Sequence, residues 1–158
     1  MLALQALCAF EAVGQKFGEQ LDEFLHDEQA LVDLDIDLPP PAELLSFART
    51  LAQGAWAQKR QLDDKLSRTA QHWSLTRMTP VDRNILRLGL HELLEHPETP
   101  PQVVINEAIE LARRFGDADS PAFVNGVLDA IRRADAGAAD RTQESDADNQ
   151  TEGDRGSV

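Results

Sequence analysis

The sequence predicts an all-α fold, a compact bundle of about seven helices, and two patterns support this. Apolar residues recur three and four positions apart, which places them on one face of a helix, and no segment alternates like a β-strand. Prolines and glycines divide these segments where helices begin or end. With 158 residues, 42% of them hydrophobic, the chain can form one core.

The first half of the chain predicts four helices. The apolar stripe of the first consists of Ala3, Leu7, Phe10, Gly14 and Phe17. A second helix covers residues 19–32 and is closed by DLDIDLPPP. Three consecutive prolines cannot lie inside a helix but can start one, so a third follows them. Its apolar face is formed by Leu44, Leu45, Phe47, Ala48, Leu51 and Ala55. The fourth covers residues 59–73, with Leu62, Leu66 and Trp73 facing inward.

The second half has clearer helix boundaries. Thr79 and Asp82 have the spacing of a capping box and Pro80 stands between them, so a fifth helix begins at Pro80. After PETPP a sixth helix covers residues 102–115, and Gly116 is its expected left-handed cap. Ser120 and the proline after it start a seventh helix. Its apolar face is formed by Phe123, Val124, Val127, Leu128 and Ile131.

Two asparagines in these last helices are candidate structural residues. Asn106 and Asn125 stand among hydrophobic neighbours in the sequence, where a polar side chain needs a partner. We expect both to form hydrogen bonds between helices.

The segment HELLEH, residues 91–96, differs from the zinc-hydrolase motif H-E-x-x-H by one extra residue. Five residues turn a helix by about 140°, so His91 and His96 point to different sides and cannot easily share one zinc ion. We therefore expect no metal site and no catalytic residue here. The segment instead predicts the end of an amphipathic helix with solvated polar groups and with buried Leu90, Leu93 and Leu94.

The chain is strongly acidic, with a formal net charge of −13. This argues against binding nucleic acid through charge alone. Residues 134–158 contain seven acidic residues and two arginines, and their only large hydrophobe is Val158. We therefore expect a disordered acidic tail at residues 134–158 after a folded domain at residues 1–133. The tail could act as a solubilising segment, an RNA mimic that inhibits binding, or a hook for a partner.

The composition also predicts the compartment. A single cysteine, Cys8, excludes an internal disulfide framework and suits a reducing cytoplasm. No apolar run approaches the roughly 20 residues that span a membrane. The apolar start of the chain is interrupted by Glu11 and follows no basic segment, so a secretory signal is not expected. The sequence predicts a soluble cytoplasmic protein without a cofactor.

Three motifs carry a resemblance to a known family: VDRNILRLGLHEL, VVINEAIELARRFGD and DSPAFVNGVLDAI. In this order and at these separations they resemble the NusB family of transcription antitermination factors, and LALQAL is similar to the first helix of that family. The resemblance covers residues 2–133 and implies an all-helical domain of two packed subdomains. It also implies a function without catalysis, in which NusB pairs with the ribosomal protein NusE. Together they hold single-stranded boxA RNA on the transcribing RNA polymerase, chiefly on ribosomal RNA operons.

The resemblance also implies site residues. In the family the segment matching ADSPAFVNG lies on the RNA face, which makes Asp119, Ser120 and Phe123 candidate RNA-binding residues. A helix start can bind phosphate and an aromatic ring can stack on a base. Structural alternatives are a helix cap for Ser120 and a core position for Phe123. Cys8 is a further candidate, because it stands where the family often has a stacking aromatic residue.

The start of the fifth helix gives the candidates for binding the protein partner. Asp82 and Arg83 stand in the matching motif, and exposed opposite charges can fix the register of an interface. The alternative is a capping box followed by a solvated helix face.

The sequence departs from the family in ways that bear on RNA binding. NusB proteins normally carry an arginine-rich arm before LALQAL, whereas this sequence starts at Met1, and Ala122 replaces a usual lysine. Either the true start lies upstream or the protein depends more on its protein partner. The alternative function is therefore a NusB-fold interaction domain with weakened or lost RNA binding. NusB-like domains also precede some ribosomal RNA methyltransferases, but this sequence has no glycine-rich cofactor loop, so we expect no enzyme.

Overall fold

The computed structural model describes residues 1–14, 16–70 and 78–151, without the side chains of Phe17 and of residues 138–151. The described ranges contain eight helices and no strand, which confirms the all-α class. The helices are α1 (Leu2–Val13), α2 (Phe17–Leu25), α3 (Glu28–Asp33), α4 (Ala42–Ala57), α5 (Lys59–Thr69), α6 (Pro80–Glu95), α7 (Pro101–Phe115) and α8 (Ser120–Thr151).

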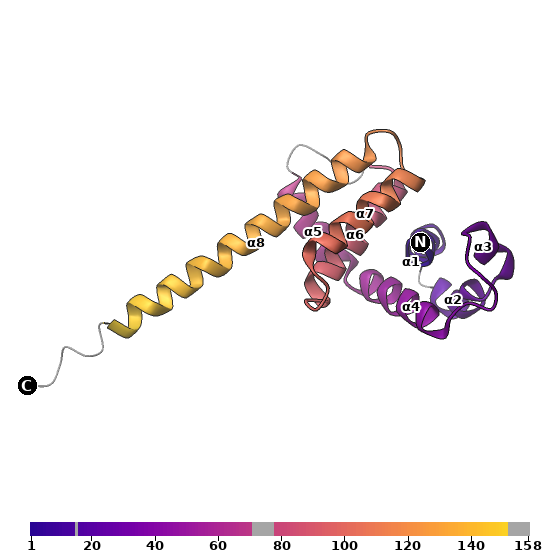
Figure 1. Ribbon diagram of the computed structural model, residues 1–158, viewed down its shortest axis with the longest axis horizontal. Coiled ribbons are helices and arrows are strands. Elements are labelled where there is room, and N and C mark those ends of the chain that lie inside the picture. Colours follow the sequence, from indigo (N-terminus) through magenta and orange to yellow (C-terminus); the bar gives the residue numbers. More distant parts are fainter. Residues whose placement is uncertain (15, 71–77, 152–158) are drawn as a thin grey trace, which may run out of the picture.

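Helix α6 is the centre of the fold. It packs against α1, α4, α5, α7 and α8, and its buried apolar face consists of Ile85, Leu86, Leu88 and Leu90. Around it the helices form two groups, since α1, α2 and α4 contact one another and α5, α7 and α8 pack on the other side (Figure 1). The contacts of α6 with α1 and α4 join the two groups into one core.

The N-terminal half contains one helix more than the sequence predicted. Gly14 ends α1 with a φ of 84°, so Phe17 begins α2 instead of continuing the stripe of the first helix. The second predicted helix is divided after Leu25, because the carboxylate of Asp27 accepts a hydrogen bond from the Ala30 amide (2.8 Å) and caps α3. Trp73, which was expected to face inward, lies outside the described residues.

In the C-terminal half the start of α6 is confirmed. The hydroxyl of Thr79 accepts a hydrogen bond from the Asp82 amide (3.1 Å), and Pro80 is the first helical residue. The expected left-handed cap at Gly116 is wrong, because its φ is −95° and its ψ is −175°. A Cβ atom at Gly116 would lie 2.6 Å from Cβ of Ser120 and 2.8 Å from the carbonyl oxygen of Ala112. Glycine is therefore required by the close approach of α8.

Helix α8 extends past the domain boundary that the sequence predicted. A disordered tail was expected at residues 134–158. Helix α8 continues to Thr151, and residues 152–158 of that segment lie outside the described part. No proline interrupts this stretch, and its alanines favour a helix. Lys65 pairs with Asp135 (2.8 Å), which holds the first residues beyond Arg133 against α5. The last part of α8 runs away from the other helices (Figure 1). The division at residue 133 remains a proposal.

The end of α6 differs from the expected amphipathic pattern. His91 is buried rather than solvated, because the imidazole packs against Gly54 of α4 and its Nδ1 lies 3.0 Å from Oε1 of Gln58. Leu94, which was expected to be buried, is 42% exposed. The neighbouring helix α4 therefore covers the side of α6 that carries His91. Within the described ranges, no helix is long and apolar enough to cross a membrane.

Candidate functional site

The start of α8 brings three predicted RNA-binding residues together. The carbonyl of Asp119 accepts a hydrogen bond from the Phe123 amide (3.1 Å), and the side chain of Asp119 is exposed. Ser120 is buried, and its hydroxyl accepts a hydrogen bond from the Asp117 amide (2.9 Å). Phe123 is half-buried against the core. Ser120 therefore fixes the turn before α8, while Asp119 and part of Phe123 are accessible.

The two asparagines that were expected to join helices do not do so. Asn106 and Asn125 are both exposed, and Asn106 accepts a hydrogen bond from Gln102 of its own helix (3.1 Å). The core positions of these helices are occupied by apolar neighbours such as Val104 and Val124. The expectation was wrong because hydrophobic neighbours along the sequence do not place an adjacent residue on the buried face of a helix.

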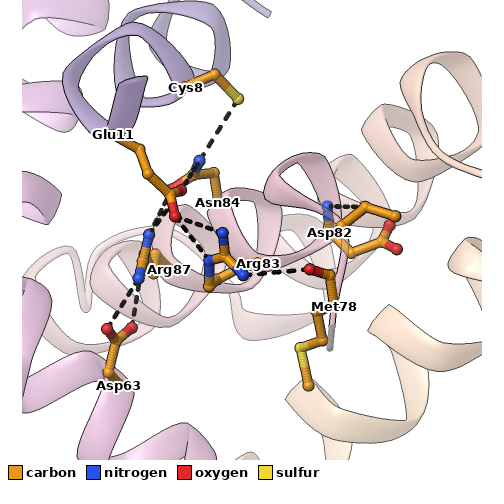
Figure 2. A network of polar contacts seen from close by, with 9 residues as sticks. Cys8, Glu11, Asp63, Met78, Asp82, Arg83, Asn84 and Arg87 are labelled. Atoms are coloured by element: carbon orange, nitrogen blue, oxygen red, sulfur yellow. Dashed lines mark hydrogen bonds and ion pairs between the residues drawn. The ribbon is translucent and has the colours of Figure 1, made fainter. Parts of the chain in front are cut away.

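A polar cluster joins α1, α5 and α6 (Figure 2). The carboxylate of Glu11 accepts hydrogen bonds from Nε of Arg83 (2.9 Å), the amide of Asn84 (2.7 Å) and Nη1 of Arg87 (3.1 Å). Arg87 also donates two hydrogen bonds to Asp63 of α5 (2.7 and 2.8 Å). Asn84 and Arg87 are almost fully buried, at 0% and 3% exposed. The cluster contains two carboxylates and two guanidinium groups, so its charges balance.

The hydrogen bonds of the cluster determine the ionisation of Glu11. Burial alone would raise the pKa of this carboxyl. The hydrogen bonds from Arg83 and Asn84, together with the positive charge of Arg87, outweigh burial and leave the pKa of Glu11 below its ordinary value. Glu11 therefore remains a carboxylate and holds the two arginines in place.

Cys8, the fourth predicted RNA-binding residue, lies at the edge of this cluster. The side-chain amide of Asn84 donates a hydrogen bond to Sγ of Cys8 (3.5 Å). Burial raises the pKa of the Cys8 thiol, and the negative charge of Glu11 raises it further. Together they outweigh the hydrogen bond from Asn84, which lowers the pKa. The side chain is thus a neutral, half-buried thiol. No contact described in the structure joins Cys8 to the start of α8.

Neither of the predicted partner-binding residues lies on a solvated helix face. The side chain of Arg83 is only 15% exposed and pairs with Glu11, and it also donates to the carbonyl of Met78 (3.2 Å). Asp82 is 8% exposed, and its Oδ1 atom has no hydrogen-bond partner within the described residues. Arg83 therefore stabilises the domain from within, and Asp82 retains an unsatisfied carboxylate oxygen at the start of α6.

The sequence reasoning missed the residues that complete the cluster, namely Glu11, Asp63, Asn84 and Arg87. Two signals could have indicated them. Glu11 interrupts the apolar N-terminal segment, and Asn84 and Arg87 stand three residues apart within a strongly apolar helix. Polar residues three apart share a helix face, and on a buried face they require partners.

The fold and the polar cluster define an all-helical domain in which partly buried ion pairs join α1, α5 and α6. In the described part of the chain, no group of three His, Cys, Asp or Glu side chains could hold a metal ion. The sequence model of the NusB family matches residues 1–133. The chain therefore belongs to the NusB family.

Individual relatives agree with this assignment. The transcription antitermination protein NusB of Geotalea daltonii is 40% identical over 134 residues, covering 82% of this chain and 88% of that protein. NusB of T. maritima has a similar structure, with a TM-score of 0.66, 34% identity and coverage of 84% of this chain and 86% of that one. A crystal structure of NusB and NusE in complex with double-stranded RNA gives a TM-score of 0.68 at 27% identity, covering 84% and 92% of the two chains.

Proposed function

We propose that this protein is a transcription antitermination factor that binds boxA-type single-stranded RNA as a heterodimer with ribosomal protein NusE. The heterodimer acts within the RNA polymerase antitermination complex and supports transcription of ribosomal RNA operons in the cytoplasm. Membership of the NusB family supports the general role, and a relative in complex with NusE and RNA supports the choice of partners.

The observation that carries the RNA role is the arrangement at the start of α8. Gly116 packs so closely against Ser120 that the turn before α8 leaves no room for a side chain at position 116. The exposed side chain of Asp119 stands one helical turn before the half-buried ring of Phe123, whose amide donates to the Asp119 carbonyl. A carboxylate can accept a hydrogen bond from the amino group of a base, and an aromatic ring can stack on the face of a base. Asp119 and Phe123 would contact the RNA, and Ser120 would position them.

The start of α6 supports a site for the protein partner. An unsatisfied buried oxygen such as Oδ1 of Asp82 costs about 1–3 kcal/mol. A basic side chain of NusE that reached this carboxylate would recover that energy and gain a charge-assisted hydrogen bond. Arg83 would contribute indirectly, because its bonds to Glu11 and Met78 hold the first turn of α6 in place.

Fluorescence anisotropy of labelled RNA tests the proposal. This protein alone, NusE alone and the equimolar pair are titrated into a boxA-type RNA and into a scrambled RNA of equal length. The pair should bind the boxA-type RNA more tightly than either protein does, and more tightly than it binds the scrambled RNA. Equal affinity of the pair for both RNAs would contradict the proposed function.

A variant at the start of α8 tests the proposed contact. Phe123→Leu keeps an apolar side chain against the core but removes the aromatic face. Loss of one stacked base costs about 1–3 kcal/mol, so we expect boxA affinity to fall about tenfold. Phe24→Leu makes the same change in α2, and it should retain wild-type affinity. Equal effects of the two variants would show that Phe123 acts only through packing.

One observation favours the alternative function, an interaction domain of the NusB fold with weakened RNA binding. Cys8 presents a half-buried neutral thiol and no stacking ring. This alternative predicts normal affinity for NusE together with equal, weak affinity for boxA-type and scrambled RNA. The same titrations therefore separate the two functions.

A further inference from the structure

Helix α5 differs in charge from the rest of this acidic protein. It is the only helix of the described chain with a net positive charge, since it contains Lys59, Arg60, Lys65 and Arg68 but only two acidic residues. One of those acids, Asp63, is engaged by Arg87, and Lys65 pairs with Asp135. Lys59 and Arg60 form no ion pair within the described ranges. The first turn of α5 therefore presents uncompensated positive charge.

An aromatic side chain and a hollow lie beside these two cations. Trp56, in the last turn of α4, stacks on Phe10 with ring centroids 5.2 Å apart and an interplanar angle of 20°. The ammonium of Lys59 lies 4.5 Å from the centroid of the Trp56 ring. Residues 56–61 line an open hollow of about 420 Å³. We call these six residues the α4–α5 corner.

The backbone of the corner is also suited to an anion. The first amides of a helix have no acceptor within it, and the helix dipole places positive charge there. No side chain caps the first turn of α5. The amides at the start of α5 thus lie in the same place as the two basic side chains, and such helix starts bind phosphate.

The corner adjoins the polar cluster that reaches Cys8. Residues three and four apart share a helix face, so Lys59 and Arg60 lie one turn from Asp63 on the same side of α5. Asp63 pairs with Arg87, which in turn pairs with Glu11 of α1. Cys8 lies one helical turn before Glu11, so the ion pairs lead from the corner to Cys8. Because both carboxylates of this path are already paired with arginines, they do not repel a nearby phosphate as free carboxylates would.

We propose that the α4–α5 corner binds the sugar-phosphate backbone of the RNA strand. Lys59, Arg60 and the first amides of α5 contact phosphates, and Trp56 holds Lys59 over its ring. This inference rests on the proposed RNA-binding function and adds a contact independent of base sequence. Positive charge beside an aromatic ring on an otherwise acidic protein matches the chemistry of a single-stranded nucleic acid.

The test compares the wild-type protein with Lys59→Gln/Arg60→Gln, each in the equimolar complex with NusE. The control, Arg132→Gln/Arg133→Gln, removes the same charge from exposed residues of α8 that pair with Asp129. Anisotropy is measured between 50 and 200 mM KCl with a boxA-type RNA of about 30 nucleotides, long enough to cover several single-strand site sizes, and with its scrambled counterpart. Circular dichroism and the affinity for NusE are measured for every variant.

The expected result is a loss of affinity that is the same for both RNAs. Each phosphate contact contributes about 0.7 to the slope of log affinity against log salt for a single strand, so two lost contacts reduce the slope by about 1.4. The loss caused by Lys59→Gln/Arg60→Gln should then be about sevenfold larger at 50 mM than at 200 mM KCl. The control should retain the wild-type slope.

Other results would overturn the inference in distinguishable ways. If the wild-type complex prefers boxA but Lys59→Gln/Arg60→Gln leaves the salt slope of RNA affinity unchanged, the corner does not contact RNA and the proposed function still stands. Weaker binding of NusE with an unchanged RNA slope would show that the corner contacts protein. A wild-type complex with no preference for boxA would remove both the proposed function and the inference that rests on it.

Discussion

Replacing the buried Arg87 by methionine should destabilise the domain more than the same substitution at an exposed arginine. The guanidinium is 3% exposed and donates to Asp63, Glu11 and Asn84. Methionine fills a similar volume but leaves the buried side-chain oxygen (Oδ1) of Asn84 without the donor that Arg87 provides. An unsatisfied buried oxygen of this kind costs about 1–3 kcal/mol. Asp63 can hydrate in part, because its side chain is 27% exposed. Breaking a buried pair costs about 3–5 kcal/mol, so we expect about 3 kcal/mol here.

Urea unfolding followed by far-ultraviolet circular dichroism measures this change, and thermal unfolding should show a loss of about 9 °C. Arg132→Met is the matched control, since Arg132 is 41% exposed and, among the described side chains, pairs only with Asp129 of its own helix. It should cost less than about 0.5 kcal/mol. Arg87→Met combined with Asp63→Leu should lose less than the sum of the two single changes. A loss below about 1 kcal/mol for Arg87→Met would refute the view that the cluster joins α1, α5 and α6.

Three further changes test separate features. Gly116→Ala should lower stability by about 2 kcal/mol, because the new methyl group overlaps Ser120, and chemical unfolding measures the loss. Gly126→Ala meets nothing within 4 Å at an interior position of α8 and should raise stability by about 0.5–1 kcal/mol in the same assay. Burial lowers the pKa of His91 below 6.5, so the folded state binds fewer protons and stability should fall as the pH drops below that value. His91→Gln should flatten this dependence in unfolding experiments between pH 5 and 8.

The helix boundaries that the sequence predicted well depend on neighbouring residues. The start of α6 at Pro80 and the start of α8 at Ser120 are both marked by a short polar side chain and a proline. Such signals act over three or four residues and can be read without knowledge of the fold. The division between α2 and α3 is also local, and Asp27 could have indicated it as a capping residue.

The polar cluster could not be predicted in the same way. Glu11 is 72 residues from Arg83, and Asp63 is 24 residues from Arg87, so these pairs exist only after the helices have packed. Gly116 shows a related limit, because its sequence context fits a helix cap while its actual constraint is a neighbour in space. Arg83 was placed on the partner side for the same reason: its position in a motif does not reveal the direction of its side chain.

The length of α8 determines how far the acidic end of the chain lies from the proposed RNA site. At 1.5 Å per residue, a helix carries residue 140 about 30 Å from its start at Ser120. Salt screens charges beyond about 8 Å at physiological ionic strength. The backbone of α8 therefore carries the acidic positions after residue 139 several screening lengths away from the RNA site proposed at Phe123. An unfolded tail of the same composition would reach that surface, so the helical continuation of α8 is compatible with the proposed RNA site on a highly acidic protein.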